Sequence, residues 1–185
     1  KLAFIGLFAG CGGLSMGLEK AGFTPILVNE LNKDAMQSYL LNRKEFPWLN
    51  DFKYNDVKDL VADSMKPKKG KPELVKKLEK KFKLNFANGD LDLLVGGPPC
   101  QGFSGIGHRR SYGVDRKFIP ANKLYEDMAQ LIINFRPKIF LFENVKGLTW
   151  AKWDKKGKKG EIWEDVKNTM AGEKKRFAEL KGYVT

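Results

Sequence analysis

The sequence has few of the residues that form disulfides or bind metals. Among 185 residues there are two cysteines, Cys11 and Cys100, and one histidine, His108. The cysteines are far apart, and each lies in a turn rich in glycine or proline, which is not the pattern of a disulfide-stabilised secreted domain. One histidine and two cysteines without paired spacing cannot supply the four ligands of a usual zinc site. We therefore predict no metal site and a reducing, cytoplasmic environment.

Long apolar runs are also missing. No stretch approaches the roughly 20 apolar residues of a membrane-spanning helix, so we expect no membrane contact. The 42% of hydrophobic residues and 12% of aromatic residues indicate a packed core and not a disordered chain. The length of 185 residues predicts one globular domain spanning 1–185.

The positive charge is concentrated in two segments. The formal net charge is +12, of which residues 66–83 contribute +7 and residues 152–181 contribute +4. Basic segments added to a nearly neutral core favour contact with a polyanion such as nucleic acid. The alternative is that the lysine runs are only solvated loops.

Apolar runs alternate with helical patterns along the chain. Strands are predicted at residues 3–8, 25–29, 91–95 and 139–142, and helices at 13–20, 33–41, 124–135 and about 161–181. Asn122 is a plausible N-cap of the third helix, which Pro137 ends. The alternation predicts an α/β fold, Rossmann-like and doubly wound around a mostly parallel sheet, with ligands at the carboxyl ends of its strands.

Residues 65–89 interrupt this pattern as a basic insertion. Pro67, Gly70 and Pro72 break any helix before a short amphipathic helix begins. Residues 105–121 have no periodicity and directly follow Cys100, so they are a candidate loop over a site.

The first functional pattern is a glycine-rich turn, Phe8-Ala9-Gly10-Cys11-Gly12-Gly13, between a strand and a helix. Glycines allow the backbone to approach a ligand closely. Glu30 ends the next strand, where a carboxylate accepts hydrogen bonds from ribose hydroxyls. Ser15 stands where the dinucleotide fingerprint G-x-G-x-x-G requires glycine, which argues against a nicotinamide cofactor. The alternative is a purely structural turn.

The second pattern surrounds Cys100 in Gly96-Gly97-Pro98-Pro99-Cys100-Gln101-Gly102-Phe103-Ser104, at the end of a strand. Two prolines stiffen the backbone ahead of the cysteine, and glycines leave room for a flat substrate, as a positioned nucleophile requires. The alternative, a cysteine buried as a small hydrophobic residue, rarely occurs in such a turn.

The third pattern is Glu143-Asn144-Val145, directly after the strand 139–142. It brings a carboxyl and a carboxamide to the sheet edge that carries Cys100. Burying a glutamate there as a bystander would be costly, so we predict that it donates a proton to a ring nitrogen. The alternative is that Glu143 caps a helix or pairs with Lys146.

The motifs FAGCGG, GGPPCQGFS and ENV, each at a strand end, closely resemble the cytosine-C5 DNA methyltransferase family over residues 1 to about 148. The resemblance implies S-adenosyl-L-methionine as cofactor, S-adenosyl-L-homocysteine as product and double-stranded DNA as substrate. It implies that Cys100 attacks cytosine C6, that Glu143 acts at N3, and that Asn144, with Pro99 and Gln101, supports the Cys100 turn. The implied cofactor contacts are Phe8, Gly10, Cys11, Gly12, Gly13, Glu30, Leu31, Asp56, Val57, Gly97, Pro99 and Leu124.

The implied reaction requires the cytosine to leave the base stack, with the loop after Cys100 closing over it. Ser104, His108, Arg109 and Arg110 are candidates to contact phosphates or fill the gap.

The chain departs from the family in three respects. Gly6 stands where many members have an acidic residue, and neither a Gln-x-Arg-x-Arg segment nor a target-recognition domain is found. We therefore expect a fold incomplete at the C-terminus: either one subunit of a split enzyme, with a second chain carrying those parts, or a piece of a longer one.

The family has prokaryotic and phage members in restriction-modification systems, so we expect such an origin. An RNA cytosine-5 methyltransferase of the same family and a non-catalytic nucleic-acid-binding remnant are the alternatives.

Overall fold

The computed structural model describes residues 2–65, 67, 69–99, 123–154 and 156–183. The chain divides into two compact units. The first unit comprises Lys1–Gly97 with Asn134–Phe142, and the second comprises Pro98–Ile133 with Glu143–Thr185. The assignment of residues 1–185 to one cofactor-binding and catalytic domain stays a prediction.

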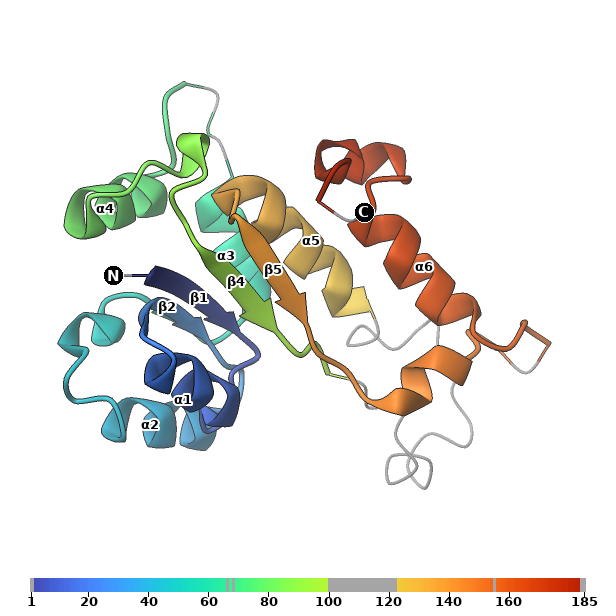
Figure 1. The fold of residues 1–185 in the computed structure, drawn as a ribbon, viewed down its shortest axis with the longest axis horizontal. Helices are drawn as coiled ribbons and strands as arrows, with labels where there is room; N and C mark the ends of the chain where they lie inside the picture. The colour runs from blue at the N-terminus through green and yellow to red at the C-terminus, as the bar shows by residue number, and fades with distance from the viewer. Residues whose placement is uncertain (1, 66, 68, 100–122, 155, 184–185) are drawn as a thin grey trace. The chain divides into compact units, whose positions relative to one another are not determined.

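The first unit is built on a five-stranded sheet in the order β3-β2-β1-β4-β5, in which all paired strands are parallel (Figure 1). Its strands are β1 (Leu2–Leu7), β2 (Phe23–Asn29), β3 (Lys53–Tyr54), β4 (Leu93–Gly96) and β5 (Ile139–Phe142). The central strands are buried nearly throughout, as expected for a sheet covered on both faces. The predicted α/β, doubly wound parallel sheet is confirmed.

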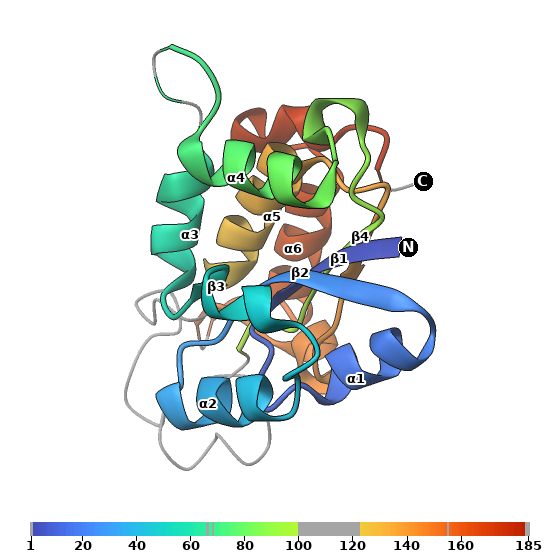
Figure 2. The same cartoon turned by 90° about the vertical axis from the view of Figure 1, so that its left-hand side faces the viewer.

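Helices of the first unit cover both faces of this sheet (Figure 2). Helices α1 (Gly13–Lys20) and α2 (Lys33–Leu41) lie on one face, and α3 (Val57–Ser64) lies on the other. Helix α2 begins where predicted because the Asn32 side chain accepts hydrogen bonds from two amides of the first turn. The end of α5 (Leu124–Phe135) joins α3 through a 2.8 Å hydrogen bond from Asn134 Nδ2 to Ser64 Oγ.

The basic segment 65–89 contains the short amphipathic helix predicted for it, α4 (Glu73–Phe82). Its residues Leu74, Val75 and Leu78 are buried, while its four lysines are exposed. The Phe82 ring contacts the ring of Trp48 at a centroid distance of 5.7 Å. This part of the insertion therefore contributes to the core and is more than a solvated loop. The short 3-10 helix η1 (Pro47–Asn50) lies between α2 and β3, and the 3-10 helix η2 (Phe86–Asn88) follows α4.

The second unit contains most of α5, the 3-10 helix η6 (Lys146–Trp150), α6 (Glu161–Met170) and the 3-10 helix η7 (Lys175–Leu180). The prediction of one helix over 161–181 is wrong, because the chain leaves α6 at Met170 and Gly172 adopts a left-handed φ of +72°. Tyr125 of α5 donates a hydrogen bond to Asp165 of α6. Burial, with this bond, raises the pKa of Tyr125. Asn122, the predicted N-cap of α5, lies outside the described residues.

Candidate functional site

The sheet reverses its winding direction between β1 and β4, since β2 and β3 extend it on one side and β4 and β5 on the other. In doubly wound sheets, ligands bind at the carboxyl ends of the strands beside this reversal. The predicted glycine turn follows β1, and Gly97 follows β4. Glu30 and Leu31 follow β2, and Asp56 and Val57 lie just after β3. The fold thus brings ten of the predicted cofactor residues to one edge of the sheet.

The glycine turn is open on one side. Gly10 and Gly12 have φ of +55° and +93°, and Phe8 takes the same left-handed region at +52°. The Ala9 amide donates to the carbonyl of Asn29 at 3.0 Å, which anchors the turn to β2. A Cβ atom added at Gly10 or Gly13 would meet nothing within 4 Å. The backbone at these positions is therefore accessible to a ligand.

Glu30 is held against this turn by its carboxylate. Oε2 accepts a hydrogen bond from the Gly10 amide at 2.8 Å, and Oε1 accepts one from the Asn32 amide at 2.8 Å. Each carboxylate oxygen keeps a further lone pair, so the group can still accept hydrogen bonds from two hydroxyls. Leu31 beside it is 71% exposed and offers an apolar surface. This arrangement fits a ribose next to a flat apolar ring.

Asn29, which was not among the predicted site residues, connects three strand ends. Its side chain is buried, and Nδ2 donates to the carbonyls of Tyr54 at 3.0 Å and Asn55 at 2.9 Å. Its Oδ1 accepts from the Phe8 amide at 3.4 Å. Asn55 in turn donates from Nδ2 to the Glu30 carbonyl at 3.1 Å. The turns after β1, β2 and β3 are therefore tied together. The sequence feature that could have pointed to Asn29 is that a single polar residue ends an otherwise apolar run.

Asp56 has a structural role in this fold. Its side chain caps α3 by accepting a hydrogen bond from the Lys58 amide at 2.9 Å, and Val57 beside it is buried. The second carboxylate oxygen accepts none of the hydrogen bonds found in the described residues, and the side chain is exposed. The predicted contact of Asp56 with an adenine stays a prediction.

Arg43 supports the glycine turn from inside the first unit. Its side chain is buried, Nε binds Glu19 Oε1 at 2.6 Å, and Nη2 donates to the Gly12 carbonyl at 2.8 Å. The guanidinium stacks 3.8 Å from the centroid of the Tyr39 ring. Burial raises the pKa of Tyr39, so this residue stays neutral near neutral pH. Sequence patterns offered no signal for Arg43, because its partners are 24 and 31 residues away.

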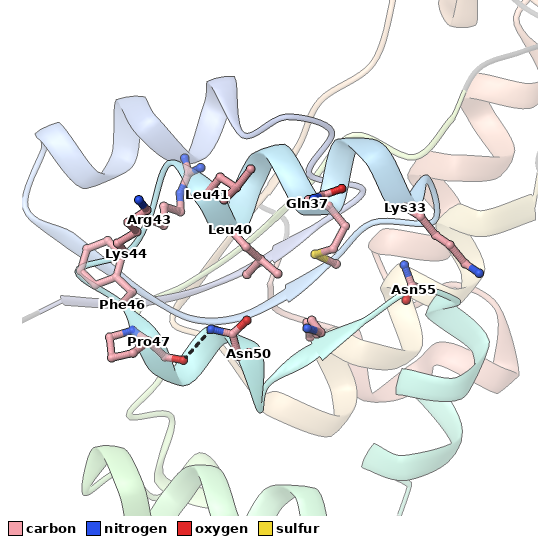
Figure 3. A pocket seen from close by; sticks show the side chains of 12 residues that line it. Lys33, Gln37, Leu40, Leu41, Arg43, Lys44, Phe46, Pro47, Asn50 and Asn55 are labelled. Carbon is pink, nitrogen blue, oxygen red and sulfur yellow. Dashed lines mark hydrogen bonds between the residues drawn. The ribbon is translucent and has the colours of Figure 1, made fainter.

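A pocket of about 510 Å³ lies beside this edge, between α2 on one side and η1 with β3 on the other (Figure 3). Its lining includes Lys33 and Asn55 at one end, and Lys44, Phe46 and Pro47 at the other. None of the predicted cofactor residues lines it. The pocket therefore lies beside the arrangement around Glu30, and Asn55 belongs to both.

In the second unit, the turn after β5 is bonded to the turn that precedes Cys100. Asn144 Nδ2 donates to the Pro98 carbonyl at 3.0 Å, and Asn144 Oδ1 accepts from the Val145 amide at 2.9 Å. Pro98 is buried and Pro99 is half-buried. This bond restrains the backbone at Pro98, and the role of Asn144 in supporting the Cys100 turn stays a prediction.

The expected burial of Glu143 at the strand end is wrong, because its side chain is exposed. Among the residues that the structure describes, Glu143 has no hydrogen bond or ion pair, so neither the helix cap nor the pair with Lys146 is found. Leu124, half-buried, is the first residue of α5.

Several predicted residues lie outside the described residues. These are Cys100, Gln101, the loop 105–121, and Ser104, His108, Arg109 and Arg110. Within the described part of the chain, no group of three or more His, Cys, Asp or Glu is placed to hold a metal ion. No helix in that part is both long and apolar enough to cross a bilayer.

Several known proteins are similar to this chain. Residues 2–173 match the family model of the C-5 cytosine-specific DNA methylase. M.MjaORF1200P of Methanocaldococcus jannaschii is 32% identical over 189 residues, covering 80% of this chain and 49% of that protein. The type II methyltransferase M.AgeI of Thalassovita gelatinovora is 34% identical over 144 residues, covering 78% of this chain and 28% of that protein. The chain thus spans at most about half the length of these relatives.

A solved structure shares the fold. It is that of a candidate DNA modification methyltransferase encoded within an E. coli prophage, with a TM-score of 0.59 and 28% identity, covering 93% of this chain and 38% of that chain. The family model covers nearly the whole sequence, and the motifs at the strand ends are those that the resemblance named. The chain therefore belongs to the C-5 cytosine-specific DNA methylase family.

Proposed function

We propose that the chain is the cofactor-binding and catalytic part of a DNA (cytosine-5)-methyltransferase. The observation that carries the proposal is the 3.0 Å bond between Asn144 and the Pro98 carbonyl, which joins the Glu143 turn to the turn leading into Cys100. An acid that acts on a ring nitrogen and a nucleophile that attacks a ring carbon of the same base must be held together. Family membership supports the same reaction.

The residues of the first unit fit S-adenosyl-L-methionine. The Glu30 carboxylate would accept hydrogen bonds from the ribose hydroxyls, and the open backbone at Gly10 and Gly13 would face the ligand. Leu31, Asp56 and Val57 would surround the adenine, and Gly97 the amino acid portion. The remaining proposed contacts of this unit are Phe8, Cys11 and Gly12, while the roles of Pro99 and Leu124 stay predictions. The bound cofactor supplies an electrophilic methyl group and is released as S-adenosyl-L-homocysteine.

The chain's own groups make cytosine reactive, because C5 of an unmodified ring is a poor nucleophile. The Cys100 thiolate adds to C6, and the displaced ring electrons give C5 enamine character. Glu143 holds or protonates N3 while negative charge develops on the ring. After C5 is methylated, water takes the C5 proton, the sulfur–C6 bond breaks, and N3 returns its proton to Glu143, which restores the aromatic ring and the free thiolate. Pro99, Gln101 and Asn144 hold the nucleophile in place.

The partner that fits this chemistry is double-stranded DNA, with the target base turned out of the stack. Because the chain spans half or less of its relatives' length, we propose that DNA recognition uses further sequence, in the same polypeptide or in a second chain. The type II relatives support a role in restriction-modification, in the cytoplasm of a prokaryote or phage host.

Two measurements test the proposal. S-adenosyl-L-homocysteine, and not NAD, should raise the melting temperature of the chain, since a ligand that binds only the folded state stabilises it. When the chain is assayed together with the further sequence that supplies DNA recognition, radiolabelled methyl from S-adenosyl-L-methionine should appear as 5-methylcytosine in unmethylated genomic DNA and not in transfer RNA. Stabilisation by NAD alone, or label confined to RNA, would refute the proposed reaction.

We predict that Asn29→Leu weakens binding of S-adenosyl-L-homocysteine about tenfold, because the carbonyls of Tyr54 and Asn55 lose their donor and the Glu30 turn loosens. Titration calorimetry measures the affinity. Asn50→Ala is the matched control, since Asn50 donates only locally, to the Pro47 carbonyl. An affinity for Asn29→Leu equal to that of the control would show that the hydrogen bonds of Asn29 do not position the proposed cofactor residues.

A further inference from the structure

A tryptophan between two lysines marks a second candidate surface, beyond the residues used in the proposed reaction. Trp150, the last residue of η6, is 56% exposed. The Nζ of Lys146 lies 5.5 Å from the centroid of its ring, and the Nζ of Lys159 lies 5.0 Å from it. Lys146 comes from η6 itself and Lys159 from the segment ahead of α6, so two separate stretches meet at this ring. We call these three residues the Trp150 cluster.

The segment around the cluster is strongly basic. Residues 146–160 contain six lysines and one acid, Asp154. Two nearby acids are used by backbone amides: Asp154 accepts from the Lys156 amide at 2.9 Å, and Glu161 accepts from the amides of Trp153 and Lys158. Glu143, three residues before Lys146, is exposed and forms no ion pair with it in the described residues. Neither Lys146 nor Lys159 forms an ion pair with any residue that the structure describes. Their charges are therefore available to an external anion.

The cluster is held on a fixed support. Leu148 of η6 is buried, and η6 packs against α6 (Figure 1). The Trp150 ring attracts both ammonium groups through its quadrupole and so limits the positions that these flexible side chains adopt. Preorganised donors lose less side-chain entropy on binding than free lysines do.

The composition of the cluster favours nucleic acid over a protein partner. The cores of protein interfaces are apolar and poor in charge, whereas here one aromatic ring stands among lysines. Lysine is a common point-charge contact of phosphate. Trp150 is six residues from Asn144, so it lies within about 22 Å of the Glu143 turn, and duplex DNA carries one charge per about 1.7 Å of axis. A duplex engaged at that turn has phosphates within reach of the cluster.

We propose that the Trp150 cluster binds the phosphate backbone of duplex DNA beside the target base, with Trp150 as a positioning residue for Lys146 and Lys159. This inference rests on the proposed DNA substrate. Two phosphate contacts contribute about 1.8 to the slope of log affinity against log salt. At 0.15 M salt this corresponds to roughly a thirtyfold gain in affinity.

The test is anisotropy of a fluorescent DNA duplex, titrated with protein at several salt concentrations. Lys146→Gln/Lys159→Gln should bind roughly thirtyfold more weakly at 0.15 M salt, with the slope reduced by about 2. Trp150→Ala should weaken binding several-fold with a smaller slope change, and Trp150→Phe should restore most of the affinity because it keeps a ring. Lys20→Gln/Lys44→Gln is the matched control, as it removes the same charge from exposed lysines of the first unit.

Binding of S-adenosyl-L-homocysteine by each variant separates this inference from the proposed function. All variants should bind it as the wild type does, since none changes a proposed cofactor contact. If both double variants lose DNA affinity equally, only net charge acts and the proposal is overturned. If DNA binding does not change, the cluster serves another partner, such as a protein, and the proposal is equally overturned. A wild type that binds neither duplex DNA nor the cofactor would remove the proposed function itself.

Discussion

Cys100→Ser is expected to lower methyl transfer to DNA by on the order of a thousandfold or more. A serine hydroxyl has nearly the size of the thiol, but it is far less ionised and less nucleophilic near neutral pH, so the ring is not activated at C5. Binding of S-adenosyl-L-homocysteine should be nearly unchanged, because the Glu30 and glycine-turn contacts of the first unit remain. Label transfer and titration calorimetry on the same preparations measure the two quantities.

A trapping experiment tests the same residue without turnover. Duplex DNA carrying 5-fluorocytosine is incubated with the protein and S-adenosyl-L-methionine. Once C5 carries both fluorine and the transferred methyl group it has no proton to lose, so elimination is blocked and a wild-type adduct should survive denaturing electrophoresis. Cys100→Ser should form none, while Lys20→Gln, which changes an exposed side chain outside the proposed site, should retain it. An adduct formed by Cys100→Ser would rule out Cys100 as the nucleophile.

Arg43→Met is expected to cause the largest loss of stability among substitutions near the site. Arg43 is buried, and it binds Glu19 at 2.6 Å and the Gly12 carbonyl at 2.8 Å. Removing one partner of a buried ion pair leaves the other charge without compensation, which costs about 3–5 kcal/mol. For a chain of this size the melting temperature should fall by roughly 10 °C. Thermal unfolding followed by circular dichroism measures it.

Two further variants make this prediction specific. Lys20→Met removes an exposed cation from α1 and should change stability by less than about 0.5 kcal/mol. Glu19→Gln/Arg43→Met removes both charges of the pair and should recover part of the loss, because no partly buried carboxylate is left unpaired. If the double variant is less stable than Arg43→Met, the pair with Glu19 is not the source of the effect.

The local elements of the first unit could be read from sequence patterns because their causes are local. Helices α1 and α2 and strand β5 have the predicted bounds, since apolar periodicity and the Asn32 cap act over a few residues. Prediction failed at residues 161–181, where the helical pattern continues past Met170. There Gly172 turns the chain and Phe177 and Leu180 are buried separately in η7. Apolar periodicity does not reveal such a turn, because tertiary packing overrides the local preference for a helix.

The sequence by itself determined which residues stand at strand ends: Glu30 after β2, the Pro98–Pro99 turn after β4 and Glu143 after β5. Each of these placements depends on a strand and its next few residues, and the motif chemistry follows from them. Only the tertiary structure decided the strand order and the bonds that depend on it. Asn29, Arg43 and Asn144 bind groups 21 to 46 residues away, and no spacing in the sequence encodes such contacts. They arise because the packing of strands and helices brings together residues that are far apart in the sequence.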